Sequence, residues 1–194
     1  MKPFEFPPVI LASASPRRRE LLTQLGVPHE VLPVDADETM HEGETPAALV
    51  RRLARVKAQA GRRHGDARMV LGSDTVVAVD GVVFGKPADR PEALRMLAAL
   101  SGREHQVFTG VALAVPATDE VLEALSETTV RMRRISPDEA EAYWQSGEPQ
   151  GKAGAYAIQG RGAVFIEHIA GSYTGVMGLP LFETACLLQA GATR

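Results

Sequence analysis

A short apolar run that leads directly into a helix start is the feature that most constrains this chain. Val9, Ile10 and Leu11 form the run, and a Ser-Ala-Ser loop connects it to Pro16. Ser15 is a good helix N-cap, and proline costs nothing at the first helical position because that N–H has no partner inside the helix. The pattern predicts a strand, a tight loop and a helix, which is the repeating unit of α/β folds.

The start of this predicted helix is suited to an anion. A helix N-terminus presents unpaired N–H groups and the positive end of the helix dipole, and the hydroxyls of Ser13 and Ser15 lie beside it. Arg17 and Arg18 precede buried-face leucines by four residues and so face the interior, whereas Arg19 faces solvent. Guanidinium groups held toward the interior suit phosphate. The alternative interpretation is an N-capped surface helix with solvated arginines.

Length, charge and cysteine content limit the class of protein. The chain has 194 residues, a net charge of -3 and one cysteine, Cys186. This length fits a single domain over 1–194, with the option of two lobes. The charge argues against a dedicated nucleic-acid binder. No signal peptide or apolar run long enough to span a membrane is recognised, and the lone cysteine favours the reducing cytoplasm.

Strand and helix patterns alternate through the first half of the chain. Strands are predicted over 29–34, 69–79, 82–84, 105–115, 121–133 and 163–169, and further helices begin at Pro46, Pro91, Pro137 and Leu181. The two long strands that follow the alternating half are expected to pair antiparallel, so the pattern predicts an α/β fold with a mixed sheet. Neither a Gly-x-Gly-x-x-Gly motif nor a Walker-type loop is present, so the Rossmann and P-loop folds lack their main signature.

One predicted strand carries an aspartate in its interior, where this residue type is disfavoured. Asp74 shares its face with Gly72 and Val76, and a glycine in a strand often marks the close approach of a ligand. A buried carboxylate needs a cation, a metal or hydrogen-bond donors. Asp74 is therefore the candidate to orient or deprotonate an attacking water. A purely structural ion pair with an arginine is the alternative.

Lysine is scarce in this sequence, and three of its few lysines occur at notable places. Lys57 falls within the apolar stripe of its predicted helix, four residues after Leu53, and we interpret it as an ammonium aimed into a cleft rather than one that reaches back to solvent. Lys86 and Lys152 lie in glycine-containing turns. The polar loop at 35–38 adds carboxylates, and carboxylates beside phosphate ligands suit Mg²⁺ or Mn²⁺.

Six motifs, in order along nearly the whole chain, resemble the Maf nucleotide pyrophosphatases. They are Ser13-Ala14-Ser15-Pro16-Arg17-Arg18, Ser73-Asp74-Thr75-Val76-Val77, Gly85-Lys86-Pro87, Ser101-Gly102 with His105 and Thr109-Gly110, Gly151 to Tyr156 with Gln159-Gly160, and Gly171-Ser172-Tyr173 with Gly178-Leu179-Pro180. The resemblance implies an ITPase-like α/β fold with two lobes around a cleft, often as a homodimer. It also implies hydrolysis of a nucleoside triphosphate to the monophosphate and pyrophosphate.

The resemblance assigns roles to individual residues. Asp74 takes the position of the catalytic aspartate, and Glu38 takes that of an acidic-loop glutamate, so both are expected to bind the divalent metal. The expected substrate contacts are the hydroxyl, cationic and amide side chains of Ser13, Ser15, Arg17, Arg18, Lys57, Thr75, Lys86, Lys152 and Gln159.

The expected substrate depends on a subset of these positions. Arg17, Thr75 and Gln159 look like the dTTP/UTP branch of the family, although the amide of Gln159 can pair with thymine, uracil or guanine alike. Two positions depart from the family pattern. Gly72-Ser73 stands where alanine is frequent in the family, and Thr174-Gly175 occupies a variable part of the turn that begins Gly171-Ser172-Tyr173. The alternative functions are a 7-methyl-GTP pyrophosphatase and a nucleotide-binding inhibitor of septum formation that acts through a partner.

Overall fold

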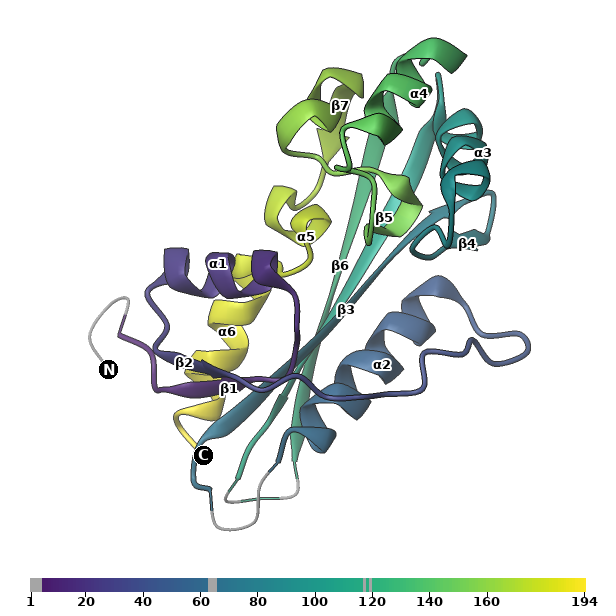
Figure 1. The fold of residues 1–194 in the computed structure, drawn as a ribbon. Helices are drawn as coiled ribbons and strands as arrows, with labels where there is room; N and C mark the ends of the chain where they lie inside the picture. Colours follow the sequence, from purple (N-terminus) through teal and green to yellow (C-terminus); the bar gives the residue numbers. More distant parts are fainter. Residues whose placement is uncertain (1–4, 63–65, 117, 119) are drawn as a thin grey trace.

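The computed structural model describes residues 5–62, 66–116, 118 and 120–194. Within these residues, seven strands form one mixed sheet in the order β2-β1-β3-β5-β6-β7, with β4 also paired to β3 (Figure 1). The strands are β1 (Val9–Leu11), β2 (His29–Val31), β3 (Met69–Val79), β4 (Val82–Phe84), β5 (Glu104–Ala114), β6 (Val121–Met132) and β7 (Ile166–Ala170). The β1 strand is parallel to β2 and β3, whereas all other pairs are antiparallel, so the predicted mixed α/β sheet is confirmed.

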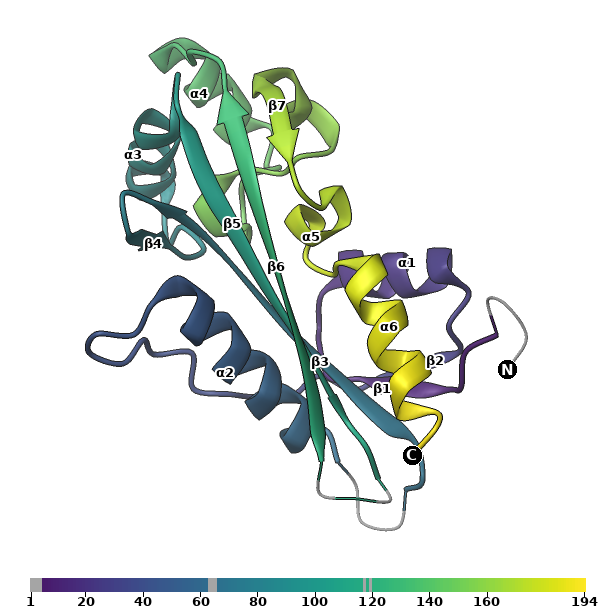
Figure 2. The ribbon, with the colours of Figure 1, turned by 180° about the vertical axis from the view of Figure 1, so that it is seen from behind.

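The helices cover both faces of this sheet. They are α1 (Pro16–Leu25), α2 (Pro46–Ala60), α3 (Arg90–Leu100), α4 (Pro137–Gln145), α5 (Tyr173–Met177) and α6 (Leu181–Gly191), with 3₁₀ turns η1 (Ala153–Ala155) and η2 (Gly160–Phe165). In the view from behind, α6 crosses the lower half of the sheet beside α1, and α5 lies above it (Figure 2). No helix in the described ranges is long and apolar enough to cross a membrane.

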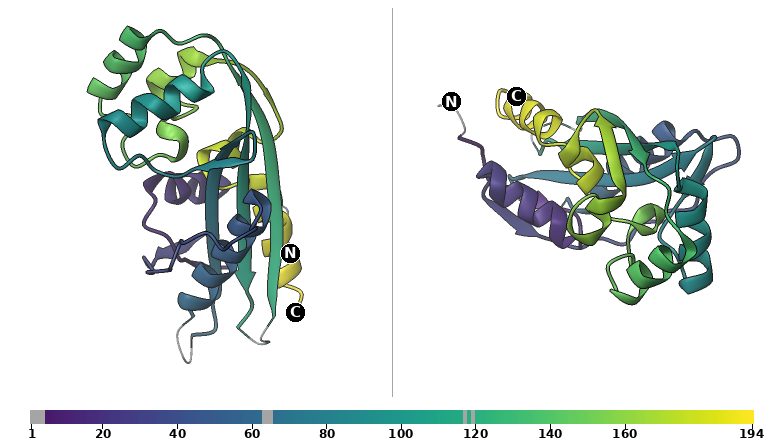
Figure 3. Two further views of the ribbon diagram at one scale, coloured as in Figure 1. Left: turned by 90° about the vertical axis from the view of Figure 1, so that its right-hand side faces the viewer. Right: turned by 90° about the horizontal axis from the view of Figure 1, so that it is seen from above.

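Two lobes share the long strands. The lower lobe holds β1, β2, α1, α2 and α6, and the upper lobe holds β4, β7, α3 and α4 (Figure 1). The strands β3, β5 and β6 pass from one lobe into the other (Figure 3). Alternating residues of the strands feed different clusters: Val9 and Leu11 pack with α1 and α6, whereas Ile10 packs with α2. A separate apolar cluster around Leu97 and Tyr143 fills the upper lobe.

Helix α2 lies unusually close to the sheet because two strand glycines face it. A Cβ on Gly72 would lie 2.3 Å from the carbonyl oxygen of Ala54, and one on Gly110 would lie 2.3 Å from that of Val50. Gly72, on the same face of β3 as Asp74, thus accommodates the backbone of α2. The expectation that Gly72 marks the close approach of a ligand is wrong, because the helix occupies that space.

Several predicted element boundaries need correction. The strand expected over 163–169 is 166–170, because the chain first turns through η2. The turn expected over 171–180 contains the short helix α5, and the strand expected over 29–34 ends at 31. Ser15 takes the N-cap position of α1, but its side chain makes no capping hydrogen bond. The predicted hairpin turn at Asp80-Gly81 and the antiparallel β5–β6 pair are confirmed.

Candidate active site

A cleft of about 950 Å³ opens beside β3, between the two lobes. Its position follows from the strand pairing: β1 pairs with β3 only as far as Leu71, and β4 joins the same edge from Val77 onward. Between these two pairings, no strand of the described chain covers this edge of β3. Side chains from both faces of β3 therefore reach the cleft, Asp74 and Val76 from one face and Thr75 from the other.

The cleft brings together every residue that the sequence marked as a candidate. Its lining includes Ser13, Ser15, Arg17, Arg18, Glu38, Lys57, Asp74, Thr75, Lys86, Lys152 and Gln159. Six different segments contribute these side chains, from the loop after β1 to the glycine-rich segment, residues 151–160, that follows α4. The geometry thus supports one shared site for all the predicted groups.

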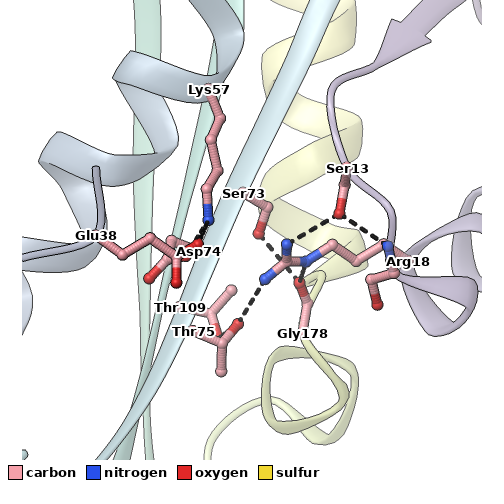
Figure 4. Close-up of polar contacts among 10 residues, drawn as sticks. Ser13, Arg18, Glu38, Lys57, Ser73, Asp74, Thr75, Thr109 and Gly178 are labelled. Atoms are coloured by element: carbon pink, nitrogen blue, oxygen red, sulfur yellow. Dashed lines mark hydrogen bonds and ion pairs between the residues drawn. The ribbon is translucent and has the colours of Figure 1, made fainter. Parts of the chain in front are cut away.

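On one side of the β3 edge, a lysine joins two carboxylates (Figure 4). The Nζ of Lys57 donates to Asp74 Oδ1 at 2.6 Å and to Glu38 Oε1 at 2.6 Å. Lys57 and Asp74 are buried, whereas the side chain of Glu38 is about half exposed. Burial opposes ionisation of Glu38, but the hydrogen bond and the charge of Lys57 outweigh it and lower the pKa of Glu38. Lys57 therefore points into the cleft as predicted, and Asp74 pairs with this lysine rather than with an arginine.

On the other side of the edge, Arg18 is held by uncharged oxygen atoms. Its Nε donates to the carbonyl of Gly178 at 2.8 Å, and its terminal nitrogens donate to Ser13 Oγ at 3.1 Å and Thr75 Oγ1 at 3.4 Å. Ser73 Oγ donates to the same Gly178 carbonyl at 3.0 Å. Burial lowers the pKa of Arg18, and the nearby Asp74 opposes this shift. This partly buried cation faces the cleft, and no carboxylate of the described residues hydrogen-bonds to it, which suits an incoming anion.

Two cations continue this positive lining toward the upper lobe. Arg17 is partly buried, and burial lowers its pKa. Burial and repulsion from Arg17 together lower the pKa of Lys152 in the glycine-rich segment. The expectation that Arg17 and Arg18 face inward and Arg19 faces solvent is confirmed, so the picture of a helix with solvated arginines is wrong for the first two.

The glycine-rich segment contributes an amide with an unused acceptor. The Oε1 atom of Gln159 is buried and has no hydrogen-bond partner among the residues described. Tyr156 and Ile158 line the same wall. An unpaired polar atom beside apolar side chains is the arrangement expected where a nucleobase edge would bind, because leaving such an atom unpaired is costly.

Sequence reasoning missed three residues that support the site. Thr109 donates its hydroxyl hydrogen to the carbonyl of Gly175 at 2.8 Å and so accepts from the Thr75 hydroxyl at 3.0 Å, which ties β5 to α5 beneath the cleft. The Gly178 carbonyl receives both Arg18 and Ser73. Glu148 lines the cleft and holds the glycine-rich segment. Thr109 and Gly178 lie in recognised motifs but carry no titratable group, and nothing in the local sequence around Glu148 indicates a partner.

The described residues contain no group of three or more histidine, cysteine, aspartate or glutamate side chains that could hold a metal. Glu38 and Asp74 nevertheless converge on one point, which Lys57 occupies. Mg²⁺ is commonly bound by only one or two carboxylates together with waters and substrate phosphates. The pair of carboxylates therefore fits a divalent ion that arrives with a polyphosphate, and does not fit an ion held by protein alone.

A protein-family model described as Maf-like protein matches residues 8–191 of this chain. The chain belongs to the Maf family. The resemblance drawn from the six motifs is thereby confirmed, because all six lie within the matched residues.

Named relatives of this Maf protein are similar over nearly its whole length. It is 56% identical over 192 residues to a dTTP/UTP pyrophosphatase of Bordetella parapertussis, across 94% of this chain and 92% of that protein. It is 54% identical over 182 residues to a dTTP/UTP pyrophosphatase of Pseudoalteromonas translucida, across 93% and 95% of the two chains. Among solved structures, the Ham1 protein of Staphylococcus aureus aligns over 83% of this chain and 80% of its own, with 14% identity and a TM-score of 0.44.

Proposed function

We propose that this Maf protein is a pyrophosphatase that hydrolyses dTTP and UTP to the nucleoside monophosphate and pyrophosphate. The observation that carries the proposal is the placement of one buried carboxylate, Asp74, among the cations and hydroxyls that line a single cleft. The identity of more than half of its residues with proteins named dTTP/UTP pyrophosphatase supports the same substrates.

The triphosphate would bind along the cationic side of the cleft. Arg18 is already fixed by Ser13, Thr75 and Gly178, so little side-chain freedom would be lost when phosphate oxygens meet its guanidinium. Ser13 and Ser15 would donate hydroxyl hydrogen bonds. The remaining positive charges of Arg17, Lys86 and Lys152 would stabilise the charge that develops on the leaving pyrophosphate.

Asp74 would act on the attacking water. Its carboxylate would accept a proton as the water oxygen bonds to the phosphorus that carries the nucleoside, and the bond from this phosphorus to the bridging oxygen would break. The pyrophosphate would leave with the electron pair of that bond. Lys57, which is hydrogen-bonded to Asp74, would keep the carboxylate directed toward the cleft.

We further propose that the reaction uses Mg²⁺ or Mn²⁺. Glu38 and Asp74 are the protein groups that would hold the ion, with the triphosphate supplying further oxygens. When bound, the ion would neutralise phosphate charge and make water more acidic. Because Lys57 bridges the two carboxylates, its ammonium would have to give up at least part of this contact as metal and substrate enter.

The part of the cleft lining that contains Tyr156, Ile158 and Gln159 would select the base. The amide of Gln159 has a buried acceptor free for the imide N–H of thymine or uracil. Thr75 and Arg17 accompany it in the lining.

We also propose that the protein is cytoplasmic and forms a homodimer. The free thiol of its single cysteine, Cys186, agrees with a cytoplasmic location. A light-scattering mass twice that of one chain would establish the homodimer.

The test is pyrophosphate release from dTTP, UTP, CTP, ITP, GTP and 7-methyl-GTP with Mg²⁺ or Mn²⁺. Preferential turnover of dTTP and UTP is the expected result. Preference for 7-methyl-GTP would retain the reaction and overturn the assignment of Arg17, Thr75 and Gln159. If the folded protein binds nucleotide but hydrolyses none, the pyrophosphatase function is wrong.

A further inference from the structure

The carboxylate of Glu148 closes the loop that carries the glycine-rich segment. Its Oε1 accepts from the backbone N–H of Gly162 at 2.9 Å, and its Oε2 accepts from that of Arg161 at 2.9 Å. These bonds join two points that are 13 and 14 residues apart, one just after α4 and one within η2. The residues between them therefore form a loop whose two ends are held by one side chain.

A tyrosine fastens the middle of this loop to the same carboxylate. The hydroxyl of Tyr143, on α4, donates to Glu148 Oε1 at 2.8 Å and accepts from the N–H of Ala157 at 3.1 Å. Tyr143 is buried and makes an edge contact with Phe165. The hydrogen bonds of Glu148 and Tyr143 thus fix the backbone on both sides of Gln159.

Contact with the carboxylate also explains the glycine that follows Gln159. A Cβ on Gly160 would lie 2.7 Å from Glu148 Oε2, and Gly160 has φ of +73°, where side chains are disfavoured. Glu148 therefore packs directly against the backbone beside Gln159. Any displacement of the carboxylate would remove the support from this part of the cleft wall.

The charge of Glu148 is opposite to that expected of a phosphate ligand. It lies in the lining with Lys152 and Arg17, where a negative charge would repel a triphosphate. Burial acts to raise the pKa of Glu148, but the hydrogen bonds from Gly162, Arg161 and Tyr143 outweigh burial and lower it. The hydrogen bonds from this loop thus favour the ionised carboxylate. We infer that Glu148 holds the loop and does not bind phosphate.

From these contacts we propose that Glu148 is a positioning residue for base selection. It holds residues 157–162 against α4 and thereby keeps the amide of Gln159, whose Oε1 has no partner among the described residues, at the wall that a nucleobase would meet. The inference rests on the proposed pyrophosphatase function for its substrates. It extends that function by naming the residue through which Gln159 is placed.

The test compares Glu148→Ala and Glu148→Gln with a matched control, Glu141→Ala. Glu141 is a glutamate on α4 itself, but its hydrogen bonds run to Arg90 and Gln145. For Glu148→Ala we expect KM for dTTP to rise about tenfold, kcat to change little, and the preference for dTTP over GTP to fall about tenfold, which corresponds to one well-placed hydrogen bond. Glu148→Gln, which keeps one acceptor oxygen, should restore part of the preference, and Glu141→Ala should leave all three quantities unchanged.

Hydrogen exchange tests the loop contacts independently of turnover. The N–H groups of Ala157, Arg161 and Gly162 should exchange faster in Glu148→Ala, and Tyr143→Phe should release Ala157 in particular. Unchanged exchange, or an unchanged dTTP-to-GTP preference in a folded Glu148→Ala protein, would overturn the inference. Failure of the unmodified protein to hydrolyse any triphosphate would instead refute the proposed function, and the exchange result would still decide whether Glu148 holds the loop.

Discussion

Lys57 on α2 and Asp74 on β3 meet at 2.6 Å, although each residue is less than one-tenth exposed. The contact depends on the close packing of α2 against the sheet, since Gly72 lets the backbone of this helix approach β3 beside Asp74. A buried ion pair of this kind is not in itself strong evidence for stability, because desolvation offsets much of the attraction. Its position at the open edge of β3 points to chemistry instead.

Replacement of the carboxylate should separate turnover from binding. In Asp74→Asn, we expect kcat to fall by about 10²- to 10⁴-fold, because the amide cannot accept the proton of the attacking water. Affinity for dTTP, measured by calorimetry, should change only a few-fold because Arg18 and the serine hydroxyls remain. Retention of more than a tenth of the wild-type kcat would contradict the assignment of Asp74.

Metal dependence should respond to Glu38 and not to its neighbour in the same loop. Glu38→Gln removes one of two carboxylates that converge on the proposed metal position, so the Mg²⁺ concentration for half-maximal activity should rise about tenfold. Asp35→Asn is the matched control, because Asp35 is exposed and lies outside the cleft lining. Removal of metal with EDTA should abolish turnover in all three proteins. An unchanged metal titration in Glu38→Gln would exclude this residue as a ligand.

Mild acid should destabilise the protein through His105. This histidine is fully buried, its Nε2 lies 2.7 Å from the hydroxyl of Tyr156, and burial lowers its pKa to about 4. The unfolded chain, with a histidine pKa of about 6.5, takes up a proton first as the pH falls, so stability is complete above that value and is lost toward pH 4. Between pH 7 and pH 5 this single group should cost about 2 kcal/mol in the free energy of unfolding.

Urea unfolding at the two pH values measures this loss. His105→Gln keeps a polar group opposite Tyr156 but cannot take up a proton. In this variant, most of the loss in the free energy of unfolding between pH 7 and pH 5 should disappear. The acidic residues with lowered pKa values contribute mainly below about pH 4.5, where their carboxylates take up protons, and so leave the chosen interval largely to His105. Equal pH dependence in the two proteins would show that His105 is not the titrating group.

Substitution of Gly72 should damage both stability and activity. The added Cβ of Gly72→Ala would meet backbone atoms of Ala54 and Ala58, which cannot move without shifting α2. We expect a loss of about 1–3 kcal/mol in the free energy of unfolding, as for other overpacked cores, and a fall in kcat as Lys57 moves from Asp74. Gly85→Ala, where a Cβ has open space, is the control for the free energy of unfolding. Wild-type values of both quantities in Gly72→Ala would contradict the close packing of α2.

Local patterns predicted the elements whose causes are local. The side chain of Ser136 caps α4 in a full capping box, and Asp80-Gly81 forms the hairpin turn with φ of +50° and +78°. Asp74 was identifiable because its residue type conflicts with a strand interior. The prediction is less accurate at the start of β7, because Glu148 holds Arg161 and Gly162 in the turn η2 through contacts that periodicity does not encode.

The internal contacts of the site depend on pairs that are distant in sequence. Arg18 and Gly178 are separated by 160 residues, so the sequence predicts an inward guanidinium but not the carbonyl that receives it. The prediction of a ligand at Gly72 fails for a similar reason, because a missing side chain signals close approach without indicating what approaches. Residue chemistry thus predicted the membership of the site, whereas its internal contacts required the fold.

One continuous sheet joins the two sides of the cleft, since β3, β5 and β6 extend through both lobes (Figure 3). Widening the cleft would therefore require elastic bending or twisting of hydrogen-bonded strands, which resist deformation along their whole length. The shared strands therefore limit how far the two sides of the cleft can move apart. We therefore expect the opening to sort nucleotides by size as they enter, before any chemistry begins.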